Sequence, residues 1–116
     1  MGTRLGWIVI ATIVPTANAC TTTCKEYASA ALTIHVRDAS GALVCDADVV
    51  ATDGGEEIAL ELFPGTKCSY AGAWERAGDY VVTAKFDGRT ATSERVSVTS
   101  GACHVKSKKI DLTLPA

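Results

Sequence analysis

Residues 78–99 read GDYVVTAKFDGRTATSERVSVT and predict one long β-hairpin. In its first half, apolar residues occupy every second position, the period of a strand that buries one face. The residues of that face are Tyr80, Val82, Ala84 and Phe86. Asp87-Gly88 is a two-residue turn signal, because glycine tolerates the positive φ of a type I′ turn. A second alternating run, which ends in Val96 and Val98, then returns along the first.

Four further strands are predicted, each bounded by a turn signal. They comprise residues 30–37, 42–52, 56–62 and 103–114. Residues 56–62 could also form one or two helical turns, but Pro64-Gly65 ends the run so soon that a strand is favoured. The last strand needs a bulge near residues 107–109 to keep its apolar residues on one face. We expect residues 64–77 to form a loop that Trp74 anchors to the core.

Length and composition are typical of one small all-β domain. The chain has 116 residues and a formal net charge of -2, so it carries no basic footprint for nucleic acid. About seven strands, spaced roughly 8–12 residues apart, predict a Greek-key β-sandwich. We expect this domain to span residues 29–116.

The N-terminal residues follow the pattern of an export signal. Arg4 precedes a short apolar run, and Ala17-Asn18-Ala19 forms a small-residue cleavage site. The apolar run is too short to span a bilayer comfortably, which takes about 20 residues. We therefore expect a signal peptide at residues 1–19, in preference to a buried core segment, and a tether at residues 20–28.

Cys20 directly follows the cleavage site and resembles the lipidated cysteine of a bacterial lipobox. A lipobox favours Leu at the position of Ala17, so ordinary signal peptidase cleavage stays an alternative. Parity favours lipidation, because five cysteines in an oxidising compartment leave one unpaired. The sequence thus predicts a lipoprotein of the bacterial envelope, and Thr21, where Asp is absent, resembles the outer-membrane sorting pattern. Otherwise the protein is periplasmic or secreted.

The other cysteines predict disulfides. They are Cys24, Cys45, Cys68 and Cys103. Their spacing contains no Cys-x-x-Cys pair, so a zinc site or a thioredoxin-type redox pair has little support. Four cysteines allow three connectivities.

Metal binding has weak support. His35 and His104 are predicted to lie on the surface, and without a third ligand they make a poor metal site. Carboxylates gather near one turn, at Asp46, Asp48, Asp53, Glu56 and Glu57. The stretch lacks EF-hand spacing, which favours solvated carboxylates over a calcium site.

No pattern in the sequence predicts an enzyme or a cofactor. No nucleophile-elbow motif flanks Ser69, Ser93 or Ser97. The paired carboxylates of a glycosidase need a cleft, and a small sandwich offers little room for one. Tyr70 and Trp74 could form an exposed aromatic platform for a sugar or peptide, although a role in capping the core is favoured.

Residues 36–53, VRDASGALVCDADVVATD, resemble the opening of carboxypeptidase regulatory-like domains. Those domains begin with a strand, a D-x-x-G-x-P-V turn and a G-A-x-V strand; here Leu43 replaces the Pro and Asp46 the Gly. Residues 77–84, AGDYVVTA, resemble the G-x-Y-x-V-x-A strand of the same family. The resemblance implies a transthyretin-like sandwich of about seven strands, an accessory or binding module without activity. The cysteine-containing segments are similar to those of small bacterial lipoproteins that share this domain.

In sandwiches of this kind the first and last strands usually lie near one another. That relation favours a disulfide between Cys24 and Cys103, which leaves Cys45 to pair with Cys68. We therefore expect a non-enzymatic lipoprotein, held to the membrane through Cys20, that acts as a structural or interaction module for an envelope protein or glycan. The alternative is a secreted or periplasmic module that binds carbohydrate or peptide through the loop containing Tyr70 and Trp74.

Overall fold

The structure, a computed structural model, describes Cys24 and residues 27–116. This part of the chain forms eight β-strands and no helix. The strands are β1 (Ala30–Arg37), β2 (Asp48–Asp53), β3 (Glu56–Leu62), β4 (Ser69–Trp74), β5 (Gly78–Phe86), β6 (Arg89–Thr92), β7 (Val96–Val98) and β8 (Lys108–Thr113). The predicted all-β class is confirmed. The predicted signal peptide and Cys20 lie outside the described residues.

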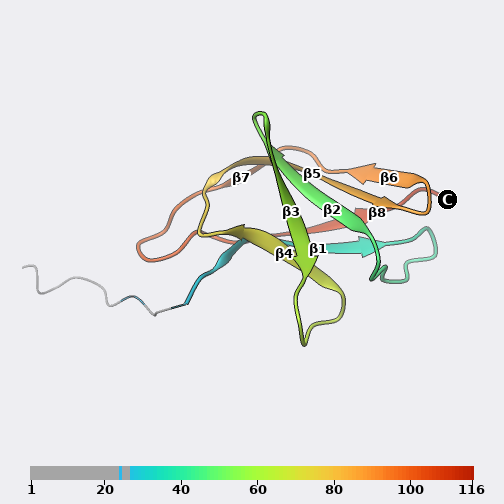
Figure 1. The fold of residues 1–116 in the computed structure, drawn as a ribbon, viewed down its shortest axis with the longest axis horizontal. Coiled ribbons are helices and arrows are strands. Elements are labelled where there is room, and N and C mark those ends of the chain that lie inside the picture. Colours follow the sequence, from blue (N-terminus) through green and yellow to red (C-terminus); the bar gives the residue numbers. More distant parts are fainter. Residues whose placement is uncertain (1–23, 25–26) are drawn as a thin grey trace, which may run out of the picture.

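The strands form one sheet in the order β6-β5-β2-β3-β4-β1-β8, with β7 paired to the start of β5. Neighbours are antiparallel except β1 and β8, which run parallel. The end strands β6 and β8 approach each other, so the sheet curls until it is nearly closed, an all-β fold of the sandwich or barrel type (Figure 1).

The predicted hairpin is confirmed and carries one interruption. Asp87 and Gly88 both have positive φ, 51° and 74°, and join β5 to β6 as a type I′ turn requires. The returning strand is divided into β6 and β7. At the break, Ser93 makes both hydrogen bonds that a residue on a neighbouring strand would make to Val82. Its amide donates to the Val82 carbonyl at 2.8 Å, and its Oγ accepts from the Val82 amide at 2.9 Å. The register shifts by one residue across the break, since Thr83 pairs with Thr92 on β6 whereas Tyr80 pairs with Val96 on β7.

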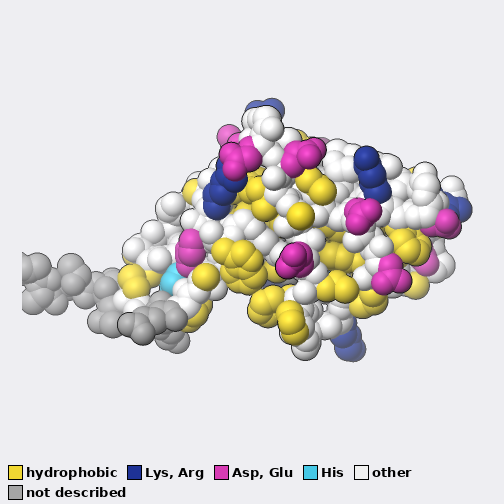
Figure 2. Space-filling view, viewed as in Figure 1, with side chains coloured by type: hydrophobic (Ala, Val, Ile, Leu, Met, Phe, Trp, Pro, Cys, Tyr) yellow, Lys and Arg dark blue, Asp and Glu magenta, His cyan; other side chains and the backbone are white. Residues whose placement is uncertain are grey.

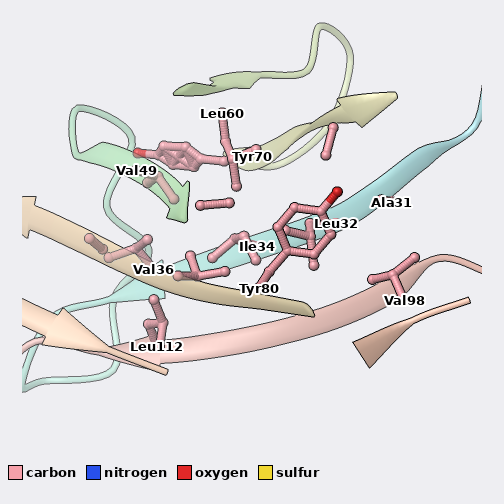
Figure 3. Packing of buried hydrophobic residues seen from close by; sticks show 14 of the residues in the cluster. Ala31, Leu32, Ile34, Val36, Val49, Leu60, Tyr70, Tyr80, Val98 and Leu112 are labelled. Atoms are coloured by element: carbon pink, nitrogen blue, oxygen red, sulfur yellow. The ribbon is translucent and has the colours of Figure 1, made fainter. Parts of the chain in front are cut away.

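The core lies inside the curled sheet. Apart from Ala31 at the start of β1, the fully buried residues on β1 and β5 are Leu32, Ile34, Val36, Tyr80, Val82 and Ala84. These are the inward faces that the alternating sequence predicts, and Phe86 at the end of β5 is partly buried. Figure 3 shows the buried side chains of several strands pointing to a common interior, with the rings of Tyr70 and Tyr80 among them.

The prediction of a loop at residues 64–77 is wrong, because β4 (Ser69–Trp74) lies there, between β3 and β1. Its Ala71-Gly72-Ala73 segment carries little β-propensity, so tertiary pairing makes this strand. Leu60 on β3 packs closely against Gly72, because a Cβ at that position would overlap Cδ2 of the leucine side chain. A strand built around a close approach of this kind has no alternating signal in the sequence.

Two other predicted strands differ from the structure at their bounds. The strand predicted at residues 42–52 is β2 (Asp48–Asp53), and Leu43 forms an isolated bridge with Arg37. The last strand is β8 (Lys108–Thr113), and the segment from Cys103 to its start is irregular. Residues 56–62 form a strand, as favoured, and not helical turns.

Both disulfides favoured by the sequence are present. Cys24 pairs with Cys103 and Cys45 with Cys68, with Cα atoms 5.3 and 5.0 Å apart. The first bridge fastens the segment before β1 to the segment before β8. The second joins the connection between β1 and β2 to the loop between β3 and β4, and so holds that loop against the sheet.

Candidate functional site

The outer face of the sheet carries a groove over β4, β1 and β8, with a volume of about 410 Å³. Side chains with three kinds of chemistry line it. Phe63 and Trp74 are aromatic, His35 and Lys109 are basic, and hydroxyl groups come from Thr33 and Ser69, among others. A mixed lining of this kind, with an apolar surface and a few placed polar groups, is typical of small-molecule sites.

Strand register places the polar lining in two rows. His35 on β1 pairs with Ser69 on β4 and with Asp111 on β8. Thr33 pairs in the same way with Ala71 and Lys109. Paired residues share a face of the sheet, and β1 alternates these positions with fully buried ones, so both rows point outward. Each row thus crosses three strands, over segments that are distant in the sequence.

The row through His35 is connected by polar contacts. Ser69 Oγ lies 2.7 Å from His35 Nε2, within hydrogen-bond distance. His35 Nδ1 lies 3.7 Å from Asp111 Oδ1, so the other ring nitrogen faces a carboxylate. Ser69 is 8% exposed, and its contact with the histidine satisfies a hydroxyl that the sheet largely covers.

Trp74 and Phe63 form the aromatic side of the groove. Their ring centroids are 5.8 Å apart with planes tilted by 40°, and they are 47% and 45% exposed. Ala73 has a positive φ of 55°, which breaks the alternation of β4 and turns Trp74 outward while Ala73 stays in the core. Figure 2 shows hydrophobic side chains gathered over β4 and the loop that follows β3.

Tyr70 does not join this aromatic surface. It is 1% exposed, and its hydroxyl donates to the Val44 carbonyl at 2.7 Å and accepts from the Ala47 amide at 3.0 Å. Burial raises the pKa of the Tyr70 phenol. The predicted roles are therefore divided: Tyr70 fills the core, and Trp74 is exposed and does not anchor the core. The exposed partner of Trp74 is Phe63, whose only sequence signal is an apolar residue directly before Pro64-Gly65.

A second polar cluster fastens the N-terminal segment. Glu75, at the end of β4 with a φ of 53°, accepts from the Ser29 amide at 2.9 Å and the Val105 amide at 3.0 Å, and it also contacts His104 Nδ1. Tyr27 stacks on His104 with ring centroids 4.7 Å apart. The contact with His104, followed by the Ser29 amide, holds the pKa of Glu75 below its usual range. This cluster joins the start of β1 to the segment that carries Cys103.

We expect the replacement Glu75→Gln to lower the melting temperature relative to wild type. This deficit should be larger at neutral pH than in acid. A lowered carboxyl pKa in the folded state contributes stability above the ordinary glutamate pKa, and that contribution is lost as the pH falls through the folded-state value. Thermal melts across the acid range measure the difference, with exposed Glu57→Gln as the matched control. A Glu75→Gln deficit that stays constant down to strong acid would contradict this assignment.

His35 lies on the outward face of β1, as predicted, but both histidines make side-chain contacts that the sequence did not indicate. His35 contacts Ser69 and Asp111, and His104 contacts Glu75 and Tyr27. Both imidazoles are partly buried because each lies against a neighbouring strand or loop.

The described part of the chain also bears on metal binding and on membrane insertion. There, no group of three or more His, Cys, Asp or Glu side chains is placed to hold a metal ion. In the predicted carboxylate cluster, Asp53 and Glu56 contact Arg76 at 3.5 and 3.0 Å. Among residues 27–116, none belongs to a helix with the length and hydropathy needed to cross a membrane.

Comparison with known proteins adds no family to these observations. No protein-family model, no curated protein sequence and no solved structure matches this chain. The likeness to carboxypeptidase regulatory-like domains therefore rests on the sequence motifs alone, and the function has to be argued from the groove.

Proposed function

We propose that this protein is an exported module of the bacterial envelope that binds a carbohydrate in the groove over β4, β1 and β8. The observation that carries the proposal is the exposed pair Trp74 and Phe63 beside a lining of hydroxyl groups. A sugar ring has an apolar face of C–H groups that stacks on an aromatic ring, and hydroxyl groups at its edge. In this groove, the aromatic pair is complementary to the apolar face of a sugar, and the hydroxyl groups of the lining are complementary to its hydroxyl groups.

The aromatic pair is held in place, as a binding surface needs to be. Thr66 Oγ1 donates to the Phe63 carbonyl at 2.7 Å, and the Cys45–Cys68 disulfide ties the same loop to the connection between β1 and β2. Trp74 projects from the end of β4, a strand paired on both sides. Rigid placement reduces the ordering that a ligand has to impose, which favours affinity.

Export and anchoring are the second part of the proposal. Two disulfides in a small domain are typical of oxidising compartments. Four of the five cysteines are used in these bridges, which leaves Cys20 as the thiol available for a lipid. Intact mass of the unreduced protein from host membranes tests this part: a chain that begins at Cys20 and carries a lipid increment supports it, and an unmodified soluble chain contradicts it.

For the groove, we expect Trp74→Ala to weaken binding of envelope glycan fragments about tenfold. The reason is that an aromatic stacking contact contributes about 0.5–1.5 kcal/mol, and the upper end of this range is close to the 1.4 kcal/mol of a tenfold change. Titration calorimetry with soluble peptidoglycan and surface-polysaccharide fragments measures it.

Leu62→Ala provides the matched control. Leu62 is 46% exposed, close to the 47% of Trp74, and it lies at the end of β3 outside the groove lining. Its replacement should leave the dissociation constant unchanged. Equal losses in both variants, or unchanged binding in Trp74→Ala, would contradict the proposed site, and selective binding of extended peptides in place of glycans would contradict the proposed ligand class.

A further inference from the structure

The row Ser69–His35–Asp111 has the atom order of a Ser-His-Asp triad. The hydroxyl meets Nε2 of the imidazole at 2.7 Å, and the carboxylate faces Nδ1 at 3.7 Å. In that arrangement, the serine is the nucleophile, the histidine moves its proton and the carboxylate orients the ring. We propose that this row is a hydrolytic site for an ester, and that its substrate is an acyl group carried on the sugar bound in the groove. The choice of a sugar ester rests on the proposed function.

Three strands fix the row. β4 and β8 pair with β1 on either side, so register alone holds Ser69, His35 and Asp111 opposite one another. When Ser69 Oγ donates to Nε2, the ring hydrogen lies on Nδ1 and points toward the carboxylate, the tautomer that a general base needs. A separation of 3.7 Å is longer than a hydrogen bond, and catalytic contacts are often loose before substrate binds.

The row also borders the space where a ligand would lie. Ser69 and His35 line the groove together with Trp74 and Phe63, so a sugar on the aromatic pair would have its acyl substituents near the hydroxyl. Lys109, in the adjacent row, lines the same groove. Its ammonium group supplies the positive charge that an oxyanion requires in the transition state.

Hydrolysis at this row takes two balanced steps. Ser69 Oγ bonds to the ester carbonyl carbon and its proton passes to His35 Nε2. The carbon–oxygen bond to the sugar then breaks, and the sugar oxygen leaves with that proton. Next, water attacks the acyl carbon on Ser69 and gives a proton to His35, which returns it to Ser69 Oγ as the acyl–serine bond breaks. The products are a carboxylic acid and the free sugar hydroxyl, and water is the only co-reactant.

The test uses the disulfide-bonded protein, p-nitrophenyl acetate as a small ester and a fluorophosphonate as a serine-directed label. We expect stoichiometric labelling located to Ser69 by peptide mass spectrometry. Ser69→Ala and His35→Gln should each lower kcat/KM by about 10²-fold or more, the scale of nucleophile and general-base catalysis. Ser97→Ala is the control, since Ser97 is another strand serine with a side-chain hydrogen bond, but its hydroxyl donates to Asp79 and has no contact with a histidine.

Asp111 is a positioning residue and has its own readout. Its side chain is 68% exposed, so Asp111→Asn should lower kcat by about fivefold, the most that an exposed ion pair contributes, with KM unchanged. Asp111→Glu should restore part of the loss. If Asp111 had a purely structural role, Asp111→Asn would not lower kcat selectively, and Asp111→Glu would not restore it.

Two results would overturn the inference: wild-type hydrolysis no faster than that of Ser69→Ala, or fluorophosphonate label on other residues. Labelling of the wild-type protein needs no variant, so it decides the question even where a variant folds poorly. The proposed sugar site is tested separately, because calorimetry measures glycan binding to the wild-type protein without any hydrolysis, and labelling of Ser69 needs no glycan. Ester hydrolysis without glycan binding would contradict the proposal that the substrate is a sugar ester. Glycan binding without labelling of Ser69 would contradict the proposal that the row is a hydrolytic site.

Discussion

Replacement of Cys24 and Cys103 by serine should lower the free energy of unfolding by about 4 kcal/mol, and replacement of Cys45 and Cys68 by about 3 kcal/mol. A disulfide restricts the unfolded chain, and the restriction grows with the logarithm of the closed loop. The paired cysteines are separated by 79 residues in the first bridge and by 23 in the second. Chain entropy therefore predicts the order of the two losses and a difference of about 1 kcal/mol.

The size of the loss matters because small domains are marginally stable, by about 5–15 kcal/mol. Urea denaturation of the two double variants, in buffer without reductant, measures both losses on one scale. One effect in the folded state reduces the loss for the Cys24–Cys103 pair. Cys24 precedes β1, so its release also frees the folded chain around Tyr27 and Ser29, which gains conformational entropy. A larger loss from the Cys45–Cys68 pair would show that the native contacts of the β3–β4 loop, and not chain entropy, dominate.

The sequence predicted those parts of the fold in which the information is local. The hairpin followed from alternation on β5 and from Asp87-Gly88, a turn whose backbone conformation two adjacent residues determine. β1 was predicted with the bounds that the structure has, because apolar and polar residues alternate from Leu32 to Arg37. Each of these elements carries its own signal over a few residues.

β4 was missed because its signal is not local. Its central residues are small, and it is a strand because β3 and β1 lie on either side of it, with Gly72 close against Leu60. The assignment of Trp74 to the core failed for the same reason. A positive φ at Ala73 turns Trp74 outward and Ala73 inward, and alanine is not a residue type that predicts a positive φ.

The polar row could not be found from the sequence either. His35, Ser69 and Asp111 come from three strands, and they meet only because β8 runs parallel to β1 in one particular register. A search for local catalytic motifs passes over Ser69, since the residues that flank it on β4 have no part in the chemistry. The disulfide pairing followed from the expected sandwich fold, in which the first and last strands lie near one another, and the number of cysteines alone left three connectivities open.

Tyr70→Ala should lower the free energy of unfolding by about 3–5 kcal/mol, the range for removal of a buried aromatic ring. The ring lies within the core, and its hydroxyl holds the Val44 carbonyl and the Ala47 amide on either side of Cys45. Tyr70→Phe keeps the ring and isolates the hydroxyl. It should lower the same free energy by about 1–3 kcal/mol, because two backbone groups lose their partner in a region with little access to water.

Tyr80→Phe is the control for Tyr70→Phe. Its hydroxyl is also bonded to backbone, but it makes a single contact, to the Arg76 carbonyl at 2.7 Å. Arg76 is only partly buried and Ala77 after it is exposed, so water can replace the phenol at that carbonyl, and we expect a loss of about 1 kcal/mol. Urea denaturation should rank the losses as Tyr70→Ala, Tyr70→Phe and Tyr80→Phe. If Tyr70→Phe were as stable as wild type, the connection between β1 and β2 would be held by the Cys45–Cys68 bridge alone, and Tyr70 would act only through its ring.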